Sequence, residues 1–254
     1  MKGERARDRT VLEVTGEDRL DFLKGLVSRD VLPSGEGLAY AALLTPQGKY
    51  ICDFLMWQEA DRVLIDVASG AAARLVQRMS LYRLRAKVAL GPTGLAVWRG
   101  LGTPPDGAMA DPRHPALGWR FYGEEGALQE ADTETDWDAL RVAHLIPETD
   151  RELIADDTYI LEAGFERLGG VDFRKGCYVG QEVTARMKHK TELRKGLVRV
   201  EVSGAAPPGT EIVSEGRTIG RLFTQAGGQG IAWLRFDKTG GEMEAGEARL
   251  RLAE

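Results

Sequence analysis

KGCYVGQE, residues 175–182, is the most informative stretch of this 254-residue chain, and VTAR follows it at residues 183–186. It lies where an irregular, glycine-bearing segment (169–174) runs into residues that can continue as a helix. Gly176 and Gly180 allow backbone angles and close approaches that a β-carbon would forbid. The pattern therefore predicts a glycine-containing turn that presents one cysteine just ahead of a helix.

Cys177 is the candidate reactive residue of this stretch. Two cationic residues, Arg174 and Lys175, precede it closely, and the expected helix begins just after it. Nearby positive charge and a helix N-terminus both favour the thiolate over the thiol. A cysteine in a glycine turn also serves elsewhere as a small buried hydrophobe, so a structural role is the alternative.

The composition is that of an ordinary globular protein. Hydrophobic residues make up 43% and charged residues 29% of the chain, which is long enough to bury a sizeable core. A formal net charge of −5 argues against a general nucleic-acid binder. Two cysteines are too few for a disulfide framework, and the N-terminus lacks a secretion or organelle-targeting pattern. No apolar run approaches the ~20 residues of a membrane span, so we expect a cytoplasmic protein.

Strand-like and helix-like patterns are mixed irregularly over the first 195 residues. Strands are expected at 10–14, 38–44, 50–57, 62–67 and 84–90, and helices at 15–30, 69–79 and 136–146. The Gly- and Pro-rich stretch 91–120 indicates a loop or junction between two sub-domains. These features predict an α+β fold rather than a regular parallel sheet.

The character of the chain changes at Gly196. Short strand-like runs separated by Gly and Pro follow, at 197–202, 210–214, 219–224, 231–235 and 248–252. Five short strands at this spacing are typical of a small β-barrel. We therefore expect an α+β region over residues 1–195 and a C-terminal barrel over residues 196–254.

The histidines and cysteines do not form a metal-binding pattern. His114, His144 and His189 lie far apart in the sequence, and neither Cys-x-x-Cys nor His-x-x-x-His spacing occurs. We therefore expect no complete metal site, although Cys177 could supply one ligand to a cluster completed by a partner. A helix rising ~1.5 Å per residue would keep His189 too far from Cys177 to act as its base. A Cys–His hydrolase would need His114 or His144 to fold back.

KGCYVGQE resembles the signature of the YgfZ-type folate-binding proteins, which are relatives of the aminomethyltransferase of glycine cleavage. The resemblance extends from about Val11 to the end of the chain and is densest over residues 159–194. DPR at 111–113 and LGWR at 117–120 are similar to the branch that includes the mitochondrial iron–sulfur assembly factors. The resemblance implies a ring of two α+β portions and a β-barrel, with tetrahydrofolate in the central hole.

Two acidic residues acquire expected roles from this resemblance. Glu162, in LEAGF at 161–165, matches the segment that supplies a pterin-binding carboxylate in aminomethyltransferases. A carboxylate can accept the pterin ring N–H and its exocyclic amine together. Asp53 lies where those enzymes carry an Asp important to one-carbon transfer, although Cys52 replaces its frequent Asp neighbour. Without the resemblance, Glu162 reads as a solvated glutamate and Asp53 as an outward-facing strand residue.

Further contacts are expected around the cysteine. The residues expected to shape or hydrogen-bond its loop, or to bind folate beside it, are Gly176, Tyr178, Gln181 and Glu182. Basic side chains would hold the carboxylates of the folate tail, and arginine is the better bidentate partner. The candidates for this role are Arg174, Lys175, Arg186 and Lys188.

The resemblance implies an accessory factor that supports assembly or repair of iron–sulfur enzymes through tetrahydrofolate, with an indirect effect on tRNA modification. Its partners would be iron–sulfur assembly or client proteins, with no direct nucleic-acid or membrane contact, and the default state is a monomer. Two alternatives stay open: an aminomethyltransferase that transfers one-carbon units, and a non-catalytic scaffold that binds proteins without folate.

Overall fold

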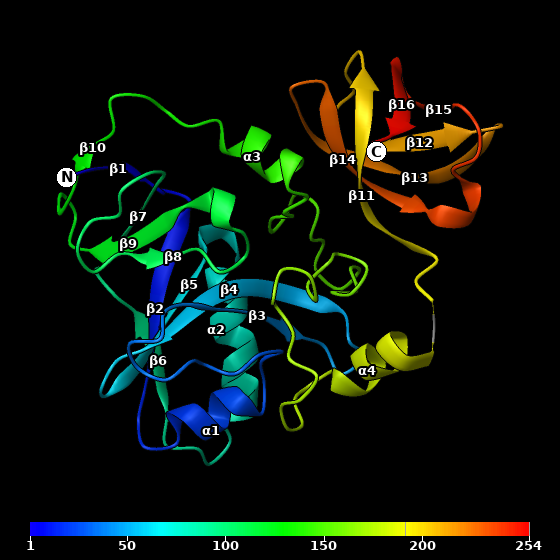
Figure 1. The fold of residues 1–254 in the computed structure, drawn as a ribbon. Coiled ribbons are helices and arrows are strands. Elements are labelled where there is room, and N and C mark those ends of the chain that lie inside the picture. The colour runs from blue at the N-terminus through cyan, green and yellow to red at the C-terminus, as the bar shows by residue number, and fades with distance from the viewer. Residues whose placement is uncertain (191, 254) are drawn as a thin grey trace.

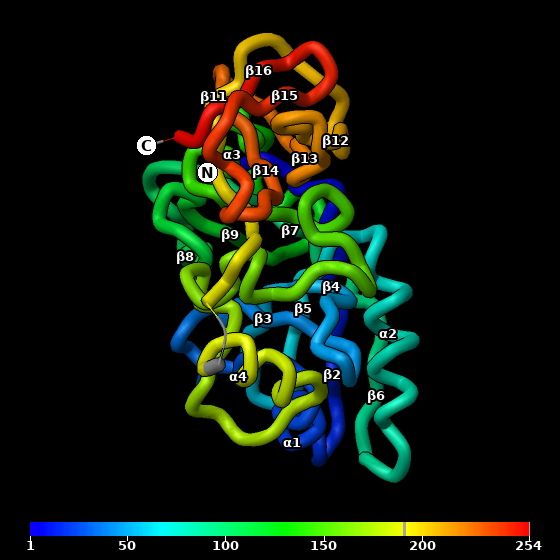
Figure 2. The backbone as a smooth tube through the Cα atoms, turned by 90° about the vertical axis from the view of Figure 1, so that its right-hand side faces the viewer, coloured from blue at the N-terminus to red at the C-terminus, as the bar shows by residue number. Residues whose placement is uncertain are grey.

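The computed structural model, which describes residues 1–190 and 192–253, contains two β-sheets and a closed β-barrel. Figure 1 shows the first sheet in the lower part of the molecule, with the second sheet and the barrel on opposite sides above it, and Figure 2 shows the barrel at the top and the first sheet at the bottom. Within the described ranges, no helix has both the length and the apolar character needed to cross a membrane. The site residues lie in the segment that runs between these three parts.

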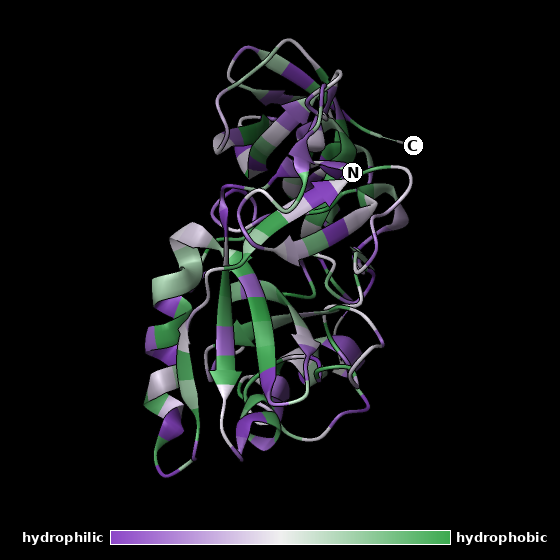
Figure 3. Ribbon diagram, turned by 90° about the vertical axis from the view of Figure 1, so that its left-hand side faces the viewer, coloured by the Kyte–Doolittle hydropathy of each residue, from purple (hydrophilic) through white to green (hydrophobic). Residues whose placement is uncertain are grey.

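The first sheet is antiparallel throughout, with strand order β3-β4-β5-β2-β6. Its strands are β2 (Arg9–Thr15), β3 (Ala39–Leu44), β4 (Tyr50–Gln58), β5 (Arg62–Ala68) and β6 (Ala89–Pro92). Helices α1 (Arg19–Lys24) and α2 (Ser69–Arg83) contribute to the apolar core on one face. Residues from 146 to 178 and from the second sheet pack on the other face. Because both faces are covered, β3 and β4 consist almost entirely of buried residues, most of them apolar. Figure 3 shows hydrophobic segments within the strands and hydrophilic residues interspersed along the neighbouring helix.

Two expectations in this region are wrong. The helix expected over 15–30 ends at Lys24, because the chain then turns so that Val27 bridges Leu43 of β3. The strand expected over 84–90 begins only at Ala89, because α2 continues to Arg83 and Leu84 adopts a positive φ of 41°. In both cases the apolar spacing did not determine the backbone conformation, and it also misjudged burial at Leu20 and Leu84, which are 39% and 89% exposed.

The second sheet has strand order β10-β1-β7-β9-β8. Its strands are β1 (Lys2–Arg5), β7 (Ala96–Gly100), β8 (Met109–Ala110), β9 (Trp119–Gly123) and β10 (Gln129–Glu130). A short 3-10 turn, η1 (Pro115–Leu117), precedes β9, and α3 (Trp137–Ala143) follows the sheet. The stretch 91–120 was expected to be a loop or junction, but it contains β7 and β8. These strands have five and two residues and are too short to show a clear periodicity in the sequence.

A ladder of buried charges joins the two sheets. Asp66 of β5 accepts hydrogen bonds from Arg9 at 2.6 Å and from Arg120 of β9 at 3.0 Å. Arg120 also donates to Asp111, which in turn binds Arg113. These opposite charges hold the pKa values of both carboxyl groups, Asp66 and Asp111, below their ordinary range despite burial. Each of these buried charges has an opposite partner, and the Arg120–Asp66 pair spans the junction between the two sheets.

The C-terminal barrel is closed in the order β11-β14-β13-β12-β15-β16. Its strands are β11 (Lys195–Ser203), β12 (Thr210–Ser214), β13 (Arg217–Ala226), β14 (Gln229–Arg235), β15 (Met243–Ala245) and β16 (Ala248–Leu252), with the 3-10 turn η2 (Phe236–Lys238) after β14. The expected barrel is confirmed. It has six strands and not the expected five, because the three-residue β15 is too short to show a strand pattern in the sequence. Gly220 permits closure, since a β-carbon there would lie 2.1 Å from the Trp233 carbonyl oxygen.

A buried ion pair fastens the barrel to the rest of the chain. Arg141 at the end of α3 donates to Glu152 at 3.1 Å, and both side chains are almost fully buried. The other carboxylate oxygen of Glu152 accepts from the hydroxyl and the backbone N–H of Thr224 in β13. Arg141 also donates to the Thr224 hydroxyl at 3.1 Å. The Thr224 hydroxyl therefore hydrogen-bonds to both Arg141 and Glu152 and helps to fix the orientation of the barrel.

Substitution Thr224→Val tests this joint. Valine keeps the shape but leaves Glu152 and Arg141 each short of a buried hydrogen-bond partner, so we expect a loss of about 1–3 kcal/mol in the free energy of unfolding. Urea denaturation would measure it. The matched control is Thr218→Val, at an exposed position of the same strand, which should change stability by less than ~0.5 kcal/mol. Equal effects of the two substitutions would contradict the role of the joint.

Candidate functional site

Two adjoining hollows between the α+β region and the barrel meet at Glu162. One has a volume of about 300 Å³ and extends toward residues 152–158 and β13, and the other, of about 530 Å³, extends toward α4 (Gln181–Lys190) and residues 192–195. The residues that line both hollows are Glu162, Lys195, Trp233 and Arg235. The structure thus places Glu162 where the α+β region faces the barrel.

The Glu162 carboxylate is buried but weakly satisfied. Its side chain is 8% exposed, Lys195 Nζ lies 3.6 Å from one oxygen, and Trp233 donates its indole N–H to the other at 3.4 Å. Burial raises the pKa of Glu162 above its ordinary value, and the Lys195 charge and the Trp233 hydrogen bond offset only part of that rise. Both contacts are longer than a typical hydrogen bond. A carboxylate in this state can gain from a ligand that brings two better-placed N–H donors.

The walls of the two hollows combine flat apolar surface with charges of both signs, and the acidic residues besides Glu162 are Glu152, Asp157, Glu192, Glu211 and Asp237. Trp233 forms the shared wall, with Lys195 Nζ 5.0 Å from its ring centroid, and the second hollow adds Met187 and Leu193. Basic side chains at the edges are Lys49, Arg194, Arg221 and Arg235. Such a site suits an aromatic ligand that carries donors at one end and negative charge at the other.

Cys177 lies on a different part of the surface. Its side chain is exposed, in the turn that leads into α4, and Cys177 is not among the residues that line either hollow. Helix α4 connects the two places, because it begins at Gln181 beside the cysteine turn and Met187 on its next turns lines the larger hollow. The structure therefore brings Glu162 and Cys177 to the two ends of one short helix rather than into one cavity.

The other residues of the 175–182 stretch mainly build the turn. Gly180 has φ +85° and packs so closely on the β3–β4 hairpin that a β-carbon would lie 2.6 Å from the Thr45 carbonyl oxygen. Tyr178 is buried, which raises the pKa of its phenol to about 12. Gln181 donates weakly to the Gly176 carbonyl at 3.4 Å, and Gly176 itself is exposed. These contacts give the stretch a structural role beside any chemistry of Cys177.

The basic residues expected to hold a folate tail point in several directions. Arg186 pairs with Glu182 at 3.1 Å on the exposed side of α4, and Lys188 pairs with Glu166. The Arg174 side chain is 96% exposed, and the Lys175 ammonium is buried against α1. None of these residues lines either hollow in the described part of the chain. Folate contacts of Glu182 and Arg186 stay predictions.

Asp53 is buried in β4 and fully engaged, contrary to the expectation of an outward-facing position. Its carboxylate accepts hydrogen bonds from three hydroxyl groups, those of Tyr40 at 2.9 Å, Tyr50 at 2.7 Å and Thr149 at 2.6 Å. The ring of Phe165 stacks on Tyr40 with a centroid distance of 5.0 Å. Because β4 is covered on both faces, its polar residue turns to neighbouring hydroxyls instead of solvent. A catalytic role of Asp53 stays a prediction.

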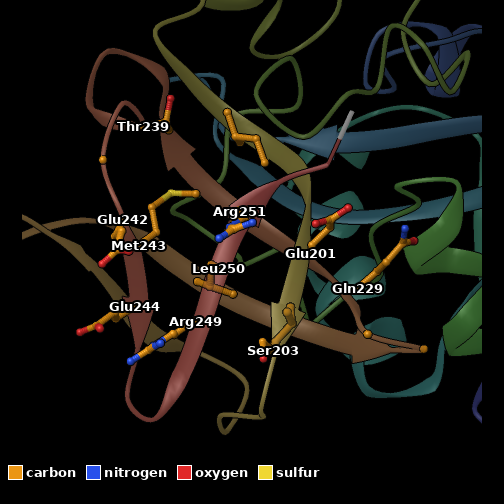
Figure 4. A pocket seen from close by; sticks show the side chains of 15 residues that line it. Glu201, Ser203, Gln229, Thr239, Glu242, Met243, Glu244, Arg249, Leu250 and Arg251 are labelled. Carbon is orange, nitrogen blue, oxygen red and sulfur yellow. The ribbon is translucent and has the colours of Figure 1, made fainter.

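A hollow of about 920 Å³ lies on the barrel and carries no sign of a ligand site. Figure 4 shows exposed charged side chains along its edges, with Glu244 beside Arg249 and Glu201 near Arg251. These residues face each other across neighbouring strands, Glu201 opposite Arg251 and Glu244 opposite Arg249. Alternating charges on the outer face of a barrel are what a solvated surface requires. The hollow contains none of the residues predicted for the site.

Among the residues that the structure describes, no group of three or more His, Cys, Asp and Glu side chains is placed to hold a metal ion. His114 and His144 do come together, with ring centroids 4.0 Å apart, although they are distant in the sequence. Neither lies among the residues that line the hollows at Glu162. The structure therefore offers Cys177 as a single exposed thiol without a metal cluster of its own.

Sequence reasoning missed Trp233, Lys195 and Met187 as parts of the site. Trp233 stands between Ala232 and Leu234, which are both fully buried in the barrel core. Side chains alternate along a strand, so this tryptophan must point out of the barrel. An aromatic residue at an outward-facing barrel position is the signal that could have revealed it.

Comparison with known proteins gives concordant results. The C-terminal residues 194–254 match the family described as the CAF17 C-terminal beta-barrel domain. The chain is 32% identical to human "Iron-sulfur cluster assembly factor IBA57, mitochondrial", with 92% of this chain and 78% of that protein covered. It is 27% identical to the IBA57 homolog of Pyricularia oryzae, with 91% and 71% covered.

A solved structure shows the same fold. Glycine cleavage system aminomethyltransferase T from Bartonella henselae superposes with a TM-score of 0.78 over 98% of this chain and 84% of that one, at 13% sequence identity. Together with the closed barrel, this similarity confirms the α+β fold with a C-terminal barrel that the sequence predicted. At this identity the similarity concerns the fold alone.

The expectation of a cytoplasmic protein is wrong by the same comparison. The relatives from human, mouse and Pyricularia oryzae are all named as mitochondrial proteins. The expectation rested on two unpaired cysteines, on the lack of a targeting pattern in residues 1–10 and on the lack of a membrane-spanning apolar run, and unpaired cysteines are compatible with more than one reducing compartment. Composition therefore could not separate the cytoplasm from the mitochondrion.

The raised pKa of Glu162 predicts that its charge lowers the stability of the folded chain. The folded state binds this proton more tightly than the unfolded state, so stability is lost as pH rises from the unfolded pKa, about 4.3, through the raised folded pKa. We expect Glu162→Gln to raise Tm at pH 7 and to lose this advantage near pH 4. Calorimetry over pH 4–8 measures it, with exposed Glu166→Gln as the control. A lower Tm of Glu162→Gln at pH 7 would be inconsistent with the proposed burial cost.

Proposed function

Because this chain belongs to the family of the iron–sulfur cluster assembly factor IBA57, we propose that it is an accessory factor in iron–sulfur cluster assembly or repair that binds tetrahydrofolate. Membership in this family confirms the resemblance to the branch of the mitochondrial iron–sulfur assembly factors, which residues 111–113 and 117–120 indicated. The observation that carries the folate part of the proposal is the buried, weakly satisfied carboxylate of Glu162 between two hollows.

The chemistry of a reduced pterin fits this carboxylate. The pterin ring N–H and its exocyclic amine are adjacent donors, and Glu162 has two oxygens whose present contacts are 3.4 and 3.6 Å long. Trp233 supplies a flat wall beside the carboxylate. The remainder of the folate would follow the larger hollow past Met187 and Leu193 toward Arg194 and Arg235, whose charges suit the carboxylates of its tail.

Cys177 supplies the second part of the proposed function. Its thiol is exposed in a turn, so a partner protein can approach it without rearrangement of the barrel. The iron–sulfur cluster is cargo in this proposal, and Cys177 reacts with it or provides one ligand while an assembly or client protein provides the others. An effect on tRNA modification would be indirect, through iron–sulfur enzymes that depend on this support.

One-carbon transfer receives less support from the geometry. Asp53, the residue that would act in an aminomethyltransferase, is 3% exposed and already accepts hydrogen bonds from three hydroxyl groups. It lines neither of the two hollows that meet at Glu162. The proposed function therefore assigns the folate a binding role near Glu162 and places the reactive group at Cys177.

Titration with tetrahydrofolate tests the folate site. We expect binding clearly tighter than 1 mM, which corresponds to a free energy of about −4 kcal/mol. Glu162→Gln replaces one acceptor oxygen with an amide NH2 group, which is itself a donor and cannot accept a hydrogen bond from the pterin. We therefore expect affinity to fall about 10- to 100-fold, as for loss of a charged hydrogen bond. Glu166→Gln is the control and should bind normally. No binding by the unmodified chain at ~1 mM would favour a scaffold that works without folate.

Substitution Cys177→Ser tests the thiol. Serine keeps the size of the side chain but removes the sulfur, so we expect loss of support for iron–sulfur enzymes with unchanged affinity for tetrahydrofolate. Aconitase-type activity in a strain that depends on this chain measures the support, and titration of the purified variant measures the affinity. Unchanged enzyme activity in the variant strain would show that Cys177 is not the functional group.

A further inference from the structure

Lys175 carries a buried charge two residues before the exposed Cys177. Its side chain is 1% exposed, although the residue lies in a surface turn. The ammonium donates to the carbonyl oxygens of Lys24 at 3.0 Å and Val27 at 2.6 Å, and it lies 2.9 Å from a carboxylate oxygen of Asp30. Two of the three N–H donors of the ammonium are therefore used by carbonyl oxygens, and the ion pair with Asp30 balances its charge.

We propose that Lys175 is a positioning residue that fixes the Cys177 turn on residues 24–30 and does not bind folate. The inference rests on the proposed function in one respect, namely that Cys177 is the functional thiol. This inference replaces the expectation that Lys175 holds a folate carboxylate. The Lys175 ammonium already contacts three oxygen atoms, and the residue lines neither hollow at Glu162. The charge is directed at the end of α1 and at Asp30.

Hydrogen bonds on both sides of Cys177 reach the same segment. After the cysteine, the backbone N–H of Val179 donates to the Gly25 carbonyl at 3.2 Å. Before it, the backbone N–H of Asp172 donates to the Ser28 carbonyl at 3.0 Å. Lys175 lies between these two points and contributes the charged contact. Gly176 and Cys177 are therefore the free tip of a turn that is tied down on either side.

The segment that receives these bonds is itself held in place. The Ser28 hydroxyl donates to the Gly170 carbonyl at 2.6 Å and accepts from the backbone N–H of Ala42 in β3 at 2.8 Å. Arg29 donates to the Gly169 carbonyl at 2.7 Å. Residues 25–30 thus lie between the first sheet and the Cys177 turn and are hydrogen-bonded to both. Figure 1 shows α1 and α4 at the same end of the molecule.

The burial of an ammonium explains why a lysine suits this position. Removing a charge from water is unfavourable unless hydrogen bonds surround it, and burial accordingly lowers the pKa of Lys175 while Asp30 opposes that change. The three acceptors are arranged around a compact point charge. A planar guanidinium has a different shape and a longer reach, so arginine should not substitute for it.

The test compares Lys175→Met, which removes the charge at similar length, with Lys87→Met, which removes a cation at a position that is 73% exposed and has no proposed role. We expect the Val179 amide of Lys175→Met to exchange hydrogen at least tenfold faster, with tetrahydrofolate affinity unchanged and support of client enzymes reduced at least fivefold. Lys175→Arg should not restore either property. Lys87→Met should behave like the unmodified chain in all three measurements.

The outcomes separate this inference from the proposed function. If Lys175→Met weakens folate binding and leaves Val179 exchange unchanged, Lys175 is a ligand and the inference is wrong. If Cys177→Ser has no effect on clients, the proposed function fails, but the exchange measurement still decides whether Lys175 anchors the turn.

A second variant covers the case in which Lys175→Met does not fold. Asp30→Asn removes the carboxylate from a side chain that is 41% exposed, so the fold should survive. Local acceleration of Val179 exchange, with the barrel amides unchanged, would support the anchor. Unchanged exchange at Val179 in Asp30→Asn would overturn it.

Discussion

The buried ion pair of Arg141 and Glu152 sets where the barrel stands against the rest of the chain. A buried charge is costly unless other groups hydrogen-bond to it, and here the Thr224 hydroxyl bonds to both side chains and the Glu148 backbone N–H donates to Glu152. Glu152 also lines the smaller of the hollows that meet at Glu162. The same contact that attaches the barrel therefore fixes the space available for a ligand, because Glu162 belongs to one side of the hollow and Trp233 to the other.

The buried carboxylates of this chain differ in how many short hydrogen bonds they accept. That difference distinguishes Glu162, the carboxylate proposed to bind a ligand, from the others. Asp66 and Asp111 are each bound by two arginines, and Asp53 accepts from three hydroxyl groups within 2.9 Å. Glu162 has only two long contacts, and burial raises its pKa. The first three therefore stabilise the fold, whereas Glu162 retains capacity for a ligand at some cost in stability.

Helix α4 relates the two proposed functional groups. It spans ten residues, or about 15 Å, between the Cys177 turn and the larger hollow at Glu162. A ligand in that hollow would touch Met187 on the helix, and a partner at Cys177 would touch the turn that precedes its first residue. The geometry thus separates the proposed folate site from the proposed reactive thiol, with α4 between them.

Local patterns were enough for the glycine turn before α4 and for five of the six barrel strands, because each depends on neighbours close in the chain, whereas Glu162 was proposed from a family resemblance. Three features could not be read from local patterns: the burial of Asp53, the contact of the outward-facing Trp233 with Glu162, and the burial of the Lys175 ammonium. Each depends on a partner brought close only by folding, namely Thr149, Glu162 and Val27. A residue's type fixes which hydrogen bonds and charges it can offer, but packing between distant segments decides which of them reach solvent, a ligand or the protein itself.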